Sequence, residues 1–145
     1  MKQIHHVVDI DSQPGLVWEA LTTDEGLAGW WTSTLSSDGP GVGSRTRFTF
    51  GGDFNPVMEV TGAEEGYQLE WLCVDGHKKW QDNTFTFQLV DAGGGRCRLR
   101  FSQHYAVELN DDDYGSYNFN WGCYLESLRL LCTTGKGKPF HPAEH

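Results

Sequence analysis

The spacing of apolar residues changes once along the chain, and this change limits the folds that the chain can adopt. Between residues 45 and 107, apolar and polar residues alternate, which is typical of β-strands with one buried face. Between residues 113 and 133, the apolar positions follow a helical period, at Tyr117, Trp121, Leu125, Leu128 and Cys132. The sequence therefore predicts an antiparallel sheet followed by one long helix.

Shorter elements are expected before this sheet. Residues 3–11 alternate and predict a first strand, and Asp11-Ser12 offers an N-cap for a helix with Pro14 in its first turn. A second short helix is expected over residues 24–30. The Ser- and Gly-rich stretch 36–43 is expected to lack regular structure.

Glycine-rich breaks divide residues 45–107 into about five strands, and Gly135 stands where a helix C-terminus favours glycine. The resulting order is one strand, two helices, several strands and a final helix. One sheet with the long helix packed across its face accounts for this order. We therefore expect an α+β fold, and the length of 145 residues suits one domain over 1–145.

Two neighbouring segments carry a resemblance to a known family. Residues 17–23 read VWEALTT and residues 26–31 read GLAGWW. Further matching pieces follow in order, at residues 57–60, 67–71, 84–87, 98–101 and 120–128. Together they resemble START-like (SRPBCC) proteins over nearly the whole chain. More narrowly, they are similar to the branch named for activators of the ATPase of the ninety-kilodalton heat-shock protein.

This resemblance implies a helix-grip fold, in which a curved antiparallel sheet wraps around a long C-terminal helix and two short helices follow the first strand. Relatives use a cavity between helix and sheet for lipids, sterols, polyketides and similar apolar molecules. The chain departs from many relatives at Asn55-Pro56, where they have a glycine. A different turn is therefore expected at the rim of the cavity.

Acidic residues outnumber basic ones, with 20 Asp and Glu against 11 Lys and Arg and a formal net charge of −9. Such a charge repels nucleic acids and anionic membrane surfaces, so we expect neither as a partner. The one dense basic cluster, Arg96, Arg98 and Arg100, has strand spacing and is expected to form a solvated face. No apolar stretch approaches the roughly 20 residues needed to cross a bilayer.

The four cysteines, Cys73, Cys97, Cys123 and Cys132, are widely spaced and form no CxxC pair. The first residues also lack the apolar segment of an export signal. We therefore expect four reduced thiols and a cytoplasmic protein. The sequence is compatible with a monomer or a homodimer.

Aromatic residues are abundant, with six Trp, eight Phe and five Tyr. This number predicts a very aromatic core or a cavity lined with rings. The alternation assigns one set of strand side chains to the buried face: Phe48, Phe50, Tyr67, Leu69, Trp71, Cys73, Phe85, Phe87, Leu89, Cys97, Leu99 and Phe101.

The same alternation turns amide side chains inward, with Gln81 and Asn83 on one strand and Gln103 on the next. A buried amide without a partner costs about 1–3 kcal/mol, so these groups need one another, water or a ligand. A pocket with a few orienting polar groups fits this pattern. The alternative is a β-bulge that turns the amides to solvent.

A candidate binding site follows from these observations. Trp31 and Trp80 lie at the ends of expected elements and are candidate rings at a pocket mouth, with packing as a lid as the alternative. Trp18 is expected only to pack. We hypothesise one connected cavity between sheet and final helix that binds a small apolar ligand. The expected ligand-binding residues are Trp31, Phe48, Phe50, Trp71, Trp80, Asn83, Phe87, Gln103, Tyr117, Trp121 and Tyr124.

Signals for catalysis, a metal or a cofactor are weak. No serine lies in a nucleophile elbow, and Gly93-Gly94-Gly95 is typical of a hairpin turn rather than a phosphate-binding loop. The histidines and cysteines lack zinc-ligand spacing. His104 is the best candidate for proton transfer, but strand parity points it outward. We expect no catalytic residue, no metal and no cofactor.

Three functions remain open. The first is binding of a small apolar or amphipathic molecule without covalent chemistry. The second is a cyclase- or aromatase-type enzyme acting on a polyketide-like substrate in the same cavity. The third is a regulator that contacts a chaperone in a stress response, which rests only on analogy with the relatives that name the family branch.

Overall fold

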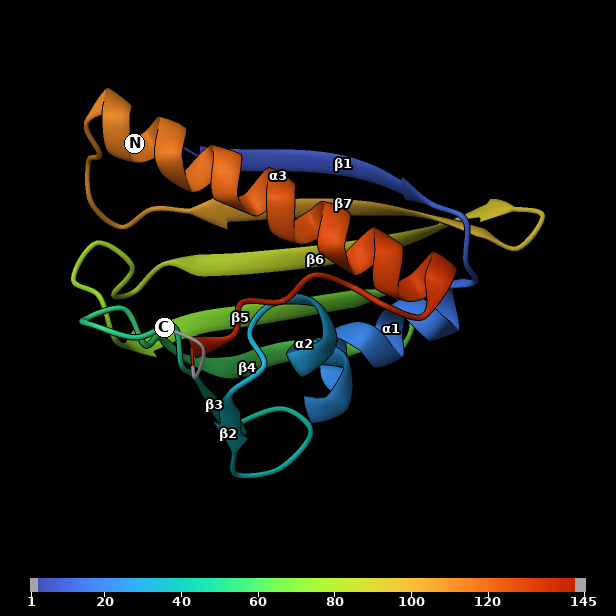
Figure 1. The fold of residues 1–145 in the computed structure, drawn as a ribbon, viewed down its shortest axis with the longest axis horizontal. Coiled ribbons are helices and arrows are strands. Elements are labelled where there is room, and N and C mark those ends of the chain that lie inside the picture. Colours follow the sequence, from blue (N-terminus) through green and yellow to red (C-terminus); the bar gives the residue numbers. More distant parts are fainter. Residues whose placement is uncertain (1–2, 143–145) are drawn as a thin grey trace.

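The computed structural model describes residues 3–142, and Figure 1 shows their ribbon. Three helices are present: α1 (Pro14–Thr22), α2 (Asp24–Trp30) and α3 (Asp111–Thr134). Seven antiparallel strands form one sheet in the order β1-β7-β6-β5-β4-β3-β2. They are β1 (Gln3–Ile10), β2 (Leu35–Ser37), β3 (Arg45–Phe48), β4 (Val57–Glu64), β5 (Gln68–Asp75), β6 (Thr84–Gly93) and β7 (Arg96–His104).

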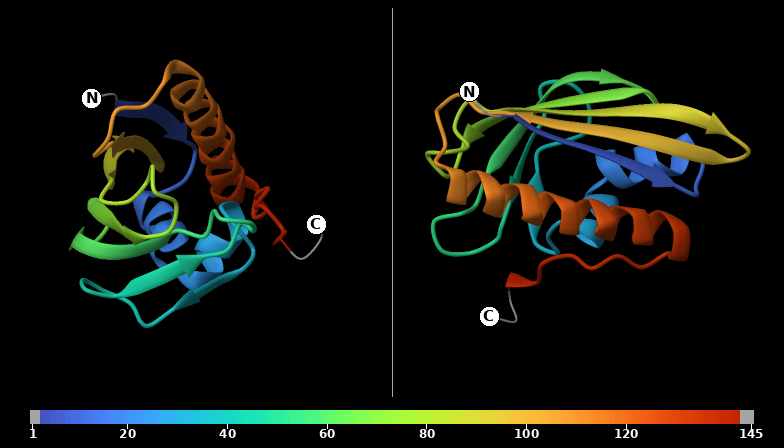
Figure 2. Two further views of the ribbon diagram at one scale, coloured as in Figure 1. Left: turned by 90° about the vertical axis from the view of Figure 1, so that its left-hand side faces the viewer. Right: turned by 90° about the horizontal axis from the view of Figure 1, so that it is seen from above.

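The sheet is curved, and the three helices lie on one side of it, as the two views of Figure 2 show. Register shifts in β4, between Val57 and Met58 and between Val60 and Gly62, add to the bending because a bulge kinks the strand that carries it. The long helix α3 runs across the sheet, and α1 and α2 fill the space beside it. The predicted α+β helix-grip fold is confirmed.

The two short helices follow the prediction except at the start of α1. Its N-cap is Gln13, and neither Asp11 nor Ser12 caps it. Thr23 ends α1 and caps α2, because its hydroxyl accepts a hydrogen bond from the Gly26 N–H at 3.0 Å. Gly26 also allows the two helices to meet closely, since a Cβ there would lie 2.6 Å from the Ala20 Cα.

Two expectations for the strands are wrong. Ser36 and Ser37 were assigned to an irregular loop, but they belong to β2, which pairs with β3 through Leu35 and Phe48. Tyr67 was assigned to the buried face but is 50% exposed, because it lies in the turn before β5. Strand parity holds only within a paired strand, so it does not apply to this turn.

The final helix matches its prediction. Asn110 caps it by accepting a hydrogen bond from the Asp113 N–H at 2.8 Å, and Gly135 ends it with a left-handed φ of 85°. Trp121, Leu125 and Leu128 are at most 2% exposed, as expected for the face that meets the sheet. No helix within residues 3–142 is long and apolar enough to cross a membrane.

Candidate functional site

Two pockets flank the aromatic core. The helix-side pocket lies between α3, the β3–β4 loop and the β5–β6 loop and has a volume of about 390 Å³. The loop-side pocket lies between α1, α2, strands β2 to β5 and the loop before β3, and has a volume of about 620 Å³. Both volumes are within the range of about 300–1,000 Å³ that is usual for small-molecule sites.

Aromatic rings form most of the helix-side pocket. Trp80 stacks nearly parallel to Trp121 with 6.1 Å between ring centroids, and Phe54 meets Trp80 edge-on at 4.9 Å. Tyr117, Trp121 and Tyr124 share one face of α3 because they are four and three residues apart. Eight of the twelve lining residues are Phe, Tyr or Trp: Trp31, Phe50, Phe54, Trp80, Tyr117, Trp121, Tyr124 and Phe140.

A few polar groups stand among these rings, namely Asp53, His77 and Asn120. The His77 Nδ1 accepts a hydrogen bond from the Lys79 N–H at 3.1 Å, so in the neutral imidazole the proton is on Nε2. The Lys79 ammonium forms an ion pair with Asp113 that joins the β5–β6 loop to the first turn of α3. This hydrogen bond to Asp113 raises the pKa of Lys79.

The hydroxyl and indole groups of this pocket act as neutral hydrogen-bonding groups. Burial raises the pKa of Tyr117 and Tyr124, so both phenols stay protonated at neutral pH. The indole Nε1 of Trp80 is buried and has no hydrogen-bond partner among residues 3–142. A buried donor without a partner is unusual in a folded protein.

The chain after α3 turns back along the helix, as Figures 1 and 2 show. Phe140 in this tail lines the helix-side pocket. The Phe140 N–H donates to the Trp31 carbonyl oxygen at 2.9 Å, and the Phe140 carbonyl accepts from the Ser33 N–H at 2.8 Å. The close path needs glycine at Gly137, since a Cβ there would lie 2.4 Å from the Gly29 carbonyl oxygen. Backbone hydrogen bonds thus hold the Phe140 ring at the pocket.

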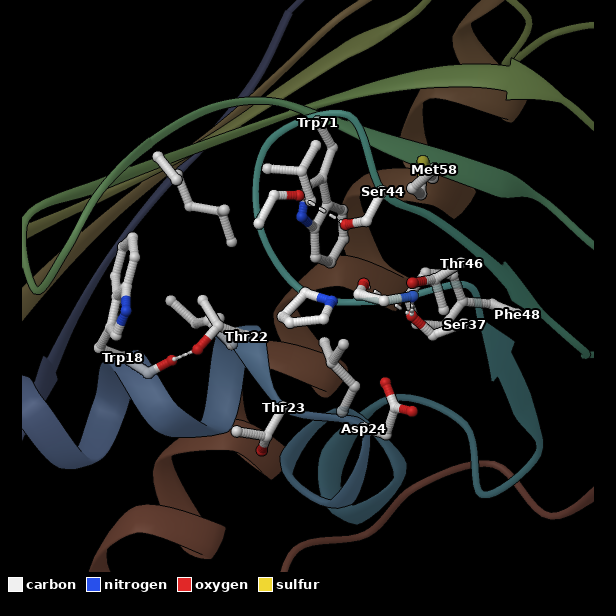
Figure 3. Close-up of a pocket in the computed structure, with 18 of the residues that line it drawn as sticks. Trp18, Thr22, Thr23, Asp24, Ser37, Ser44, Thr46, Phe48, Met58 and Trp71 are labelled. Atoms are coloured by element: carbon white, nitrogen blue, oxygen red, sulfur yellow. Dashed lines mark hydrogen bonds between the residues drawn. The ribbon is translucent and has the colours of Figure 1, made fainter.

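The loop-side pocket has a different lining, shown in Figure 3. Its inner wall is formed by Phe48, Met58, Leu69 and Trp71, which are all at most 3% exposed. Trp18 comes from α1 on another side of the opening. Serine and threonine hydroxyls and two carboxylates complete the rim.

Trp31 lies between the two pockets and is 1% exposed. Its ring centroid is 4.5 Å from that of Phe48 and 5.8 Å from that of Trp71, and both of these residues line the loop-side pocket. The same centroid is 6.4 Å from that of Trp80 and 5.3 Å from that of Trp121, and both of these residues line the helix-side pocket. The two pockets share no lining residue, so the interior holds two pockets where one connected cavity was expected, with Trp31 packed between them.

Two of the three amides expected to point inward pair with each other. The third, Gln81, lies in the turn before β6, where parity does not apply, and its Nε2 donates to the Val74 carbonyl oxygen at 2.9 Å. Asn83 and Gln103 are 0% exposed, which confirms their inward direction and rules out the bulge. The Gln103 Nε2 donates to the Asn83 Oδ1 at 2.9 Å, and the Trp121 Nε1 donates to the Gln103 Oε1 at 2.8 Å. These bonds satisfy the amides within the protein and fix the Trp121 ring in the pocket wall.

The expected ligand-binding residues are thus distributed unevenly. Six of the eleven line the helix-side pocket: Trp31, Phe50, Trp80, Tyr117, Trp121 and Tyr124. Phe48 and Trp71 line the loop-side pocket. Phe87, Asn83 and Gln103 line neither and lie in the core behind them.

Four aromatic lining residues are missing from the sequence-based set. Trp18 was expected only to pack but lines the loop-side pocket. Phe54, His77 and Phe140 line the helix-side pocket from loops and from the tail after α3. No periodicity indicates a direction in such segments, and their aromatic character was the only available signal.

The other candidates for chemistry lie outside both pockets or do not cluster. His104 is exposed on β7, as strand parity predicts. Within residues 3–142, no group of three or more His, Cys, Asp or Glu is arranged to hold a metal ion. All four cysteines are free, and Cys73 and Cys97 are buried.

A family model and a solved structure both relate this chain to the same family. Residues 11–132 match the family described as activator of Hsp90 ATPase homolog 1-like protein. The solution structure of the Aha1 dimer from Colwellia psychrerythraea is 32% identical, with a TM-score of 0.83, and the match covers 94% of this chain and 100% of that one. The search of curated proteins found no match.

More distant structures share the fold. A protein from Mesorhizobium loti is 23% identical with a TM-score of 0.74, over 90% of this chain and 96% of that one. Norcoclaurine synthase from Thalictrum flavum, solved with dopamine and hydroxybenzaldehyde, is 16% identical with a TM-score of 0.69, over 94% and 89%. The family match spans most of the chain, and the Colwellia protein is similar over nearly all of it. The chain therefore belongs to the family of activator of Hsp90 ATPase homolog 1-like proteins, within the START-like (SRPBCC) group.

Proposed function

We propose that the protein binds a small, flat aromatic molecule in the helix-side pocket. The observation that carries this proposal is that eight of the twelve lining residues bear Phe, Tyr or Trp rings. Aromatic rings bury large apolar areas and favour stacked or edge-on contact with other rings. A volume of about 390 Å³ suits a ligand of two or three fused rings better than a long lipid.

Binding free energy would come mainly from apolar area, at about 25 cal/mol per Å² before the cost of immobilising the ligand. The polar groups of the pocket would fix the orientation of the bound ligand. Asn120 and His77 line the pocket and would supply hydrogen bonds to the ligand. A phenol or similar aromatic alcohol therefore fits better than a plain hydrocarbon.

Calorimetric titration with 2-naphthol tests this proposal. Phe54→Ala removes a half-buried ring from the pocket wall and should weaken binding about five- to tenfold. Tyr67→Ala is the matched control, because Tyr67 is 50% exposed in the turn before β5 and lines neither pocket. No saturable binding at millimolar 2-naphthol, or equal losses in both variants, would remove support for the proposal.

A cyclase-type enzyme is the second candidate, and His77 favours it. Its imidazole lines the pocket with Nε2 free of the backbone contact that holds Nδ1, so it can give or take a proton at a bound substrate. The neighbour norcoclaurine synthase, which was solved with two aromatic compounds, makes such chemistry worth testing. His77→Ala should abolish turnover of a candidate substrate while weakening 2-naphthol binding by no more than about tenfold, the value of one hydrogen bond. Loss of binding alone would indicate a simple binding protein.

We also propose that the protein forms a homodimer. The Colwellia relative is a dimer, and the exposed Phe119 on α3 gives this chain an apolar surface residue that a second copy could cover. Light scattering during gel filtration should give twice the monomer mass, and Phe119→Ser should shift it toward the monomer. A monomer at all concentrations would contradict this proposal without affecting the binding pocket.

Residence in the cytoplasm is proposed on the state of the cysteines. All four are free, and reduced thiols persist in a reducing compartment. Thiol titration of the denatured protein without reductant should find four thiols. A regulatory contact with a chaperone has only the family description in its favour.

A further inference from the structure

We propose that the loop-side pocket is a second binding site, and that it takes an amphiphilic amine, an apolar or aromatic body that carries a protonated amino group. This site shares no lining residue with the helix-side pocket. The proposal therefore does not depend on the function proposed for that pocket.

The apolar body of the ligand would occupy the inner part of the pocket. Phe48, Met58, Leu69 and Trp71 form a buried wall there, and the volume of about 620 Å³ exceeds that of the helix-side pocket. Trp18 adds a second indole on α1, on another side of the opening in Figure 3. Burial against this wall gives affinity but no preference for charge.

The charged residues of the rim give that preference. Asp24 and Glu65 are the acidic members of the nineteen lining residues, and these nineteen include no Lys, Arg or His. Both carboxylates belong to exposed residues. The chain as a whole carries a formal charge of −9, so the surrounding field also attracts cations.

The hydroxyls of the lining favour a hydrogen-bond donor. Thr22, Ser37 and Ser44 each donate their hydroxyl proton to a backbone carbonyl, at 2.8, 3.1 and 2.6 Å, and Figure 3 draws these bonds. With their protons engaged, these oxygens can present only lone pairs to a ligand. Together with the two carboxylates, they form a rim that accepts hydrogen bonds, and an ammonium group donates three.

The two indoles favour a cation for a separate reason. A cation within about 6 Å of an indole face is attracted by the ring quadrupole, and Trp gives the strongest such interaction. Trp18 and Trp71 both line the pocket, which therefore combines indole rings with carboxylates. A neutral ligand of equal size would use the apolar wall alone.

The test uses three compounds with one ring system: 1-naphthylmethylamine, protonated at pH 7, neutral 1-naphthalenemethanol and anionic 1-naphthoate. Calorimetry on the whole protein should rank affinity as amine, alcohol, anion. The double variant Asp24→Asn, Glu65→Gln should weaken amine binding about three- to tenfold and leave alcohol binding within about twofold. Trp18→Ala should weaken amine binding as well.

The control variant carries Asp82→Asn and Glu108→Gln, which change the net charge equally at exposed positions outside both pockets. Asn tolerates the positive φ of 66° at position 82. Equal effects of the two double variants would overturn the proposal, since the loss would then reflect net charge. It would also be overturned if the amine bound no tighter than the alcohol, or if Phe54→Ala weakened amine binding while Asp24→Asn, Glu65→Gln did not.

Discussion

The two pockets touch the same aromatic core from different sides, yet their chemistry differs. The helix-side pocket is walled by rings from α3, two loops and the tail after α3. The loop-side pocket is walled by strand residues and α1, with hydroxyls and the carboxylates of Asp24 and Glu65 at its rim. The Trp31 ring packs against residues of both pockets, with ring centroids 4.5 Å apart for Phe48 and 5.3 Å apart for Trp121. Buried core rings thus line both pockets. The helices, loops and tail around the core give each pocket its polar groups, and so its ligand preference.

The pockets also differ in how firmly their walls are held. Trp121 is 2% exposed, and its indole N–H is fixed by the buried Gln103. Trp18 is only partly buried and packs against the edge of the core. Trp121 on the helix side is therefore part of the folding core, whereas Trp18 on the loop side can change without unfolding the protein. Four measurements can break or sharpen this contrast.

The largest effect is expected for Trp121→Ala. Deleting this ring removes a buried indole and leaves Gln103 without a partner, so the free energy of unfolding should fall by about 3–5 kcal/mol. Trp18→Ala should cost less than half as much, because that ring is partly exposed. Urea denaturation of both variants measures the difference. Equal losses would show that the two walls contribute alike to the core.

A smaller loss is expected from the amide network. Gln103→Ala leaves the Trp121 N–H and the Asn83 Oδ1 buried without a partner, and should lower stability by about 1–3 kcal/mol. Gln88→Ala is the matched control on β6, where the side chain points away from the core, and should stay within about 0.5 kcal/mol. If Gln103→Ala were equally mild, the helix-side wall would not depend on these bonds.

The division of the interior predicts a gain of binding. Trp31→Leu replaces the indole between the two pockets by a smaller side chain. A ligand too long for either pocket, such as 1-hexadecanol, should then bind about tenfold tighter, which corresponds to about 1.4 kcal/mol. Trp30→Leu is the control, because Trp30 is also buried but lines neither pocket. An unchanged affinity in Trp31→Leu would mean that more than this indole separates the pockets.

The smallest effect concerns pH and two thiols, Cys73 on β5 and Cys132 on α3. Burial raises the pKa of both thiols to about 11, above the ordinary value of 9.0. Between these values the unfolded chain loses thiol protons that the folded protein keeps, so it binds fewer protons and stability falls as pH rises.

Denaturation midpoints measured from pH 8 to pH 11 should therefore decline, and the decline should be shallower in the variant Cys73→Ala, Cys132→Ala. Cys123, which is exposed, should react with iodoacetamide before the other thiols. An identical slope with and without the two thiols would show that other groups cause the decline.

Much of the fold was predictable because its signals are local and periodic. Alternation predicted the five strands from β3 to β7, and the helical period predicted that Trp121, Leu125 and Leu128 face the sheet. The inward direction of Asn83 and Gln103 followed from the same parity. Tyr67 was assigned wrongly because it lies in a turn, where parity has no meaning.

The sites were less predictable because they depend on contacts between distant segments. The sequence by itself determined an aromatic interior, two inward amides and a sheet that grips a helix, since each follows from composition or periodicity. Only the tertiary structure decided that Gln103 pairs with Asn83 and Trp121, and that Trp31 packs against rings of both pockets. Those outcomes depend on how rings and amides from α2, α3 and the strands fill one shared volume, and close packing is a property of the assembled core rather than of any single segment.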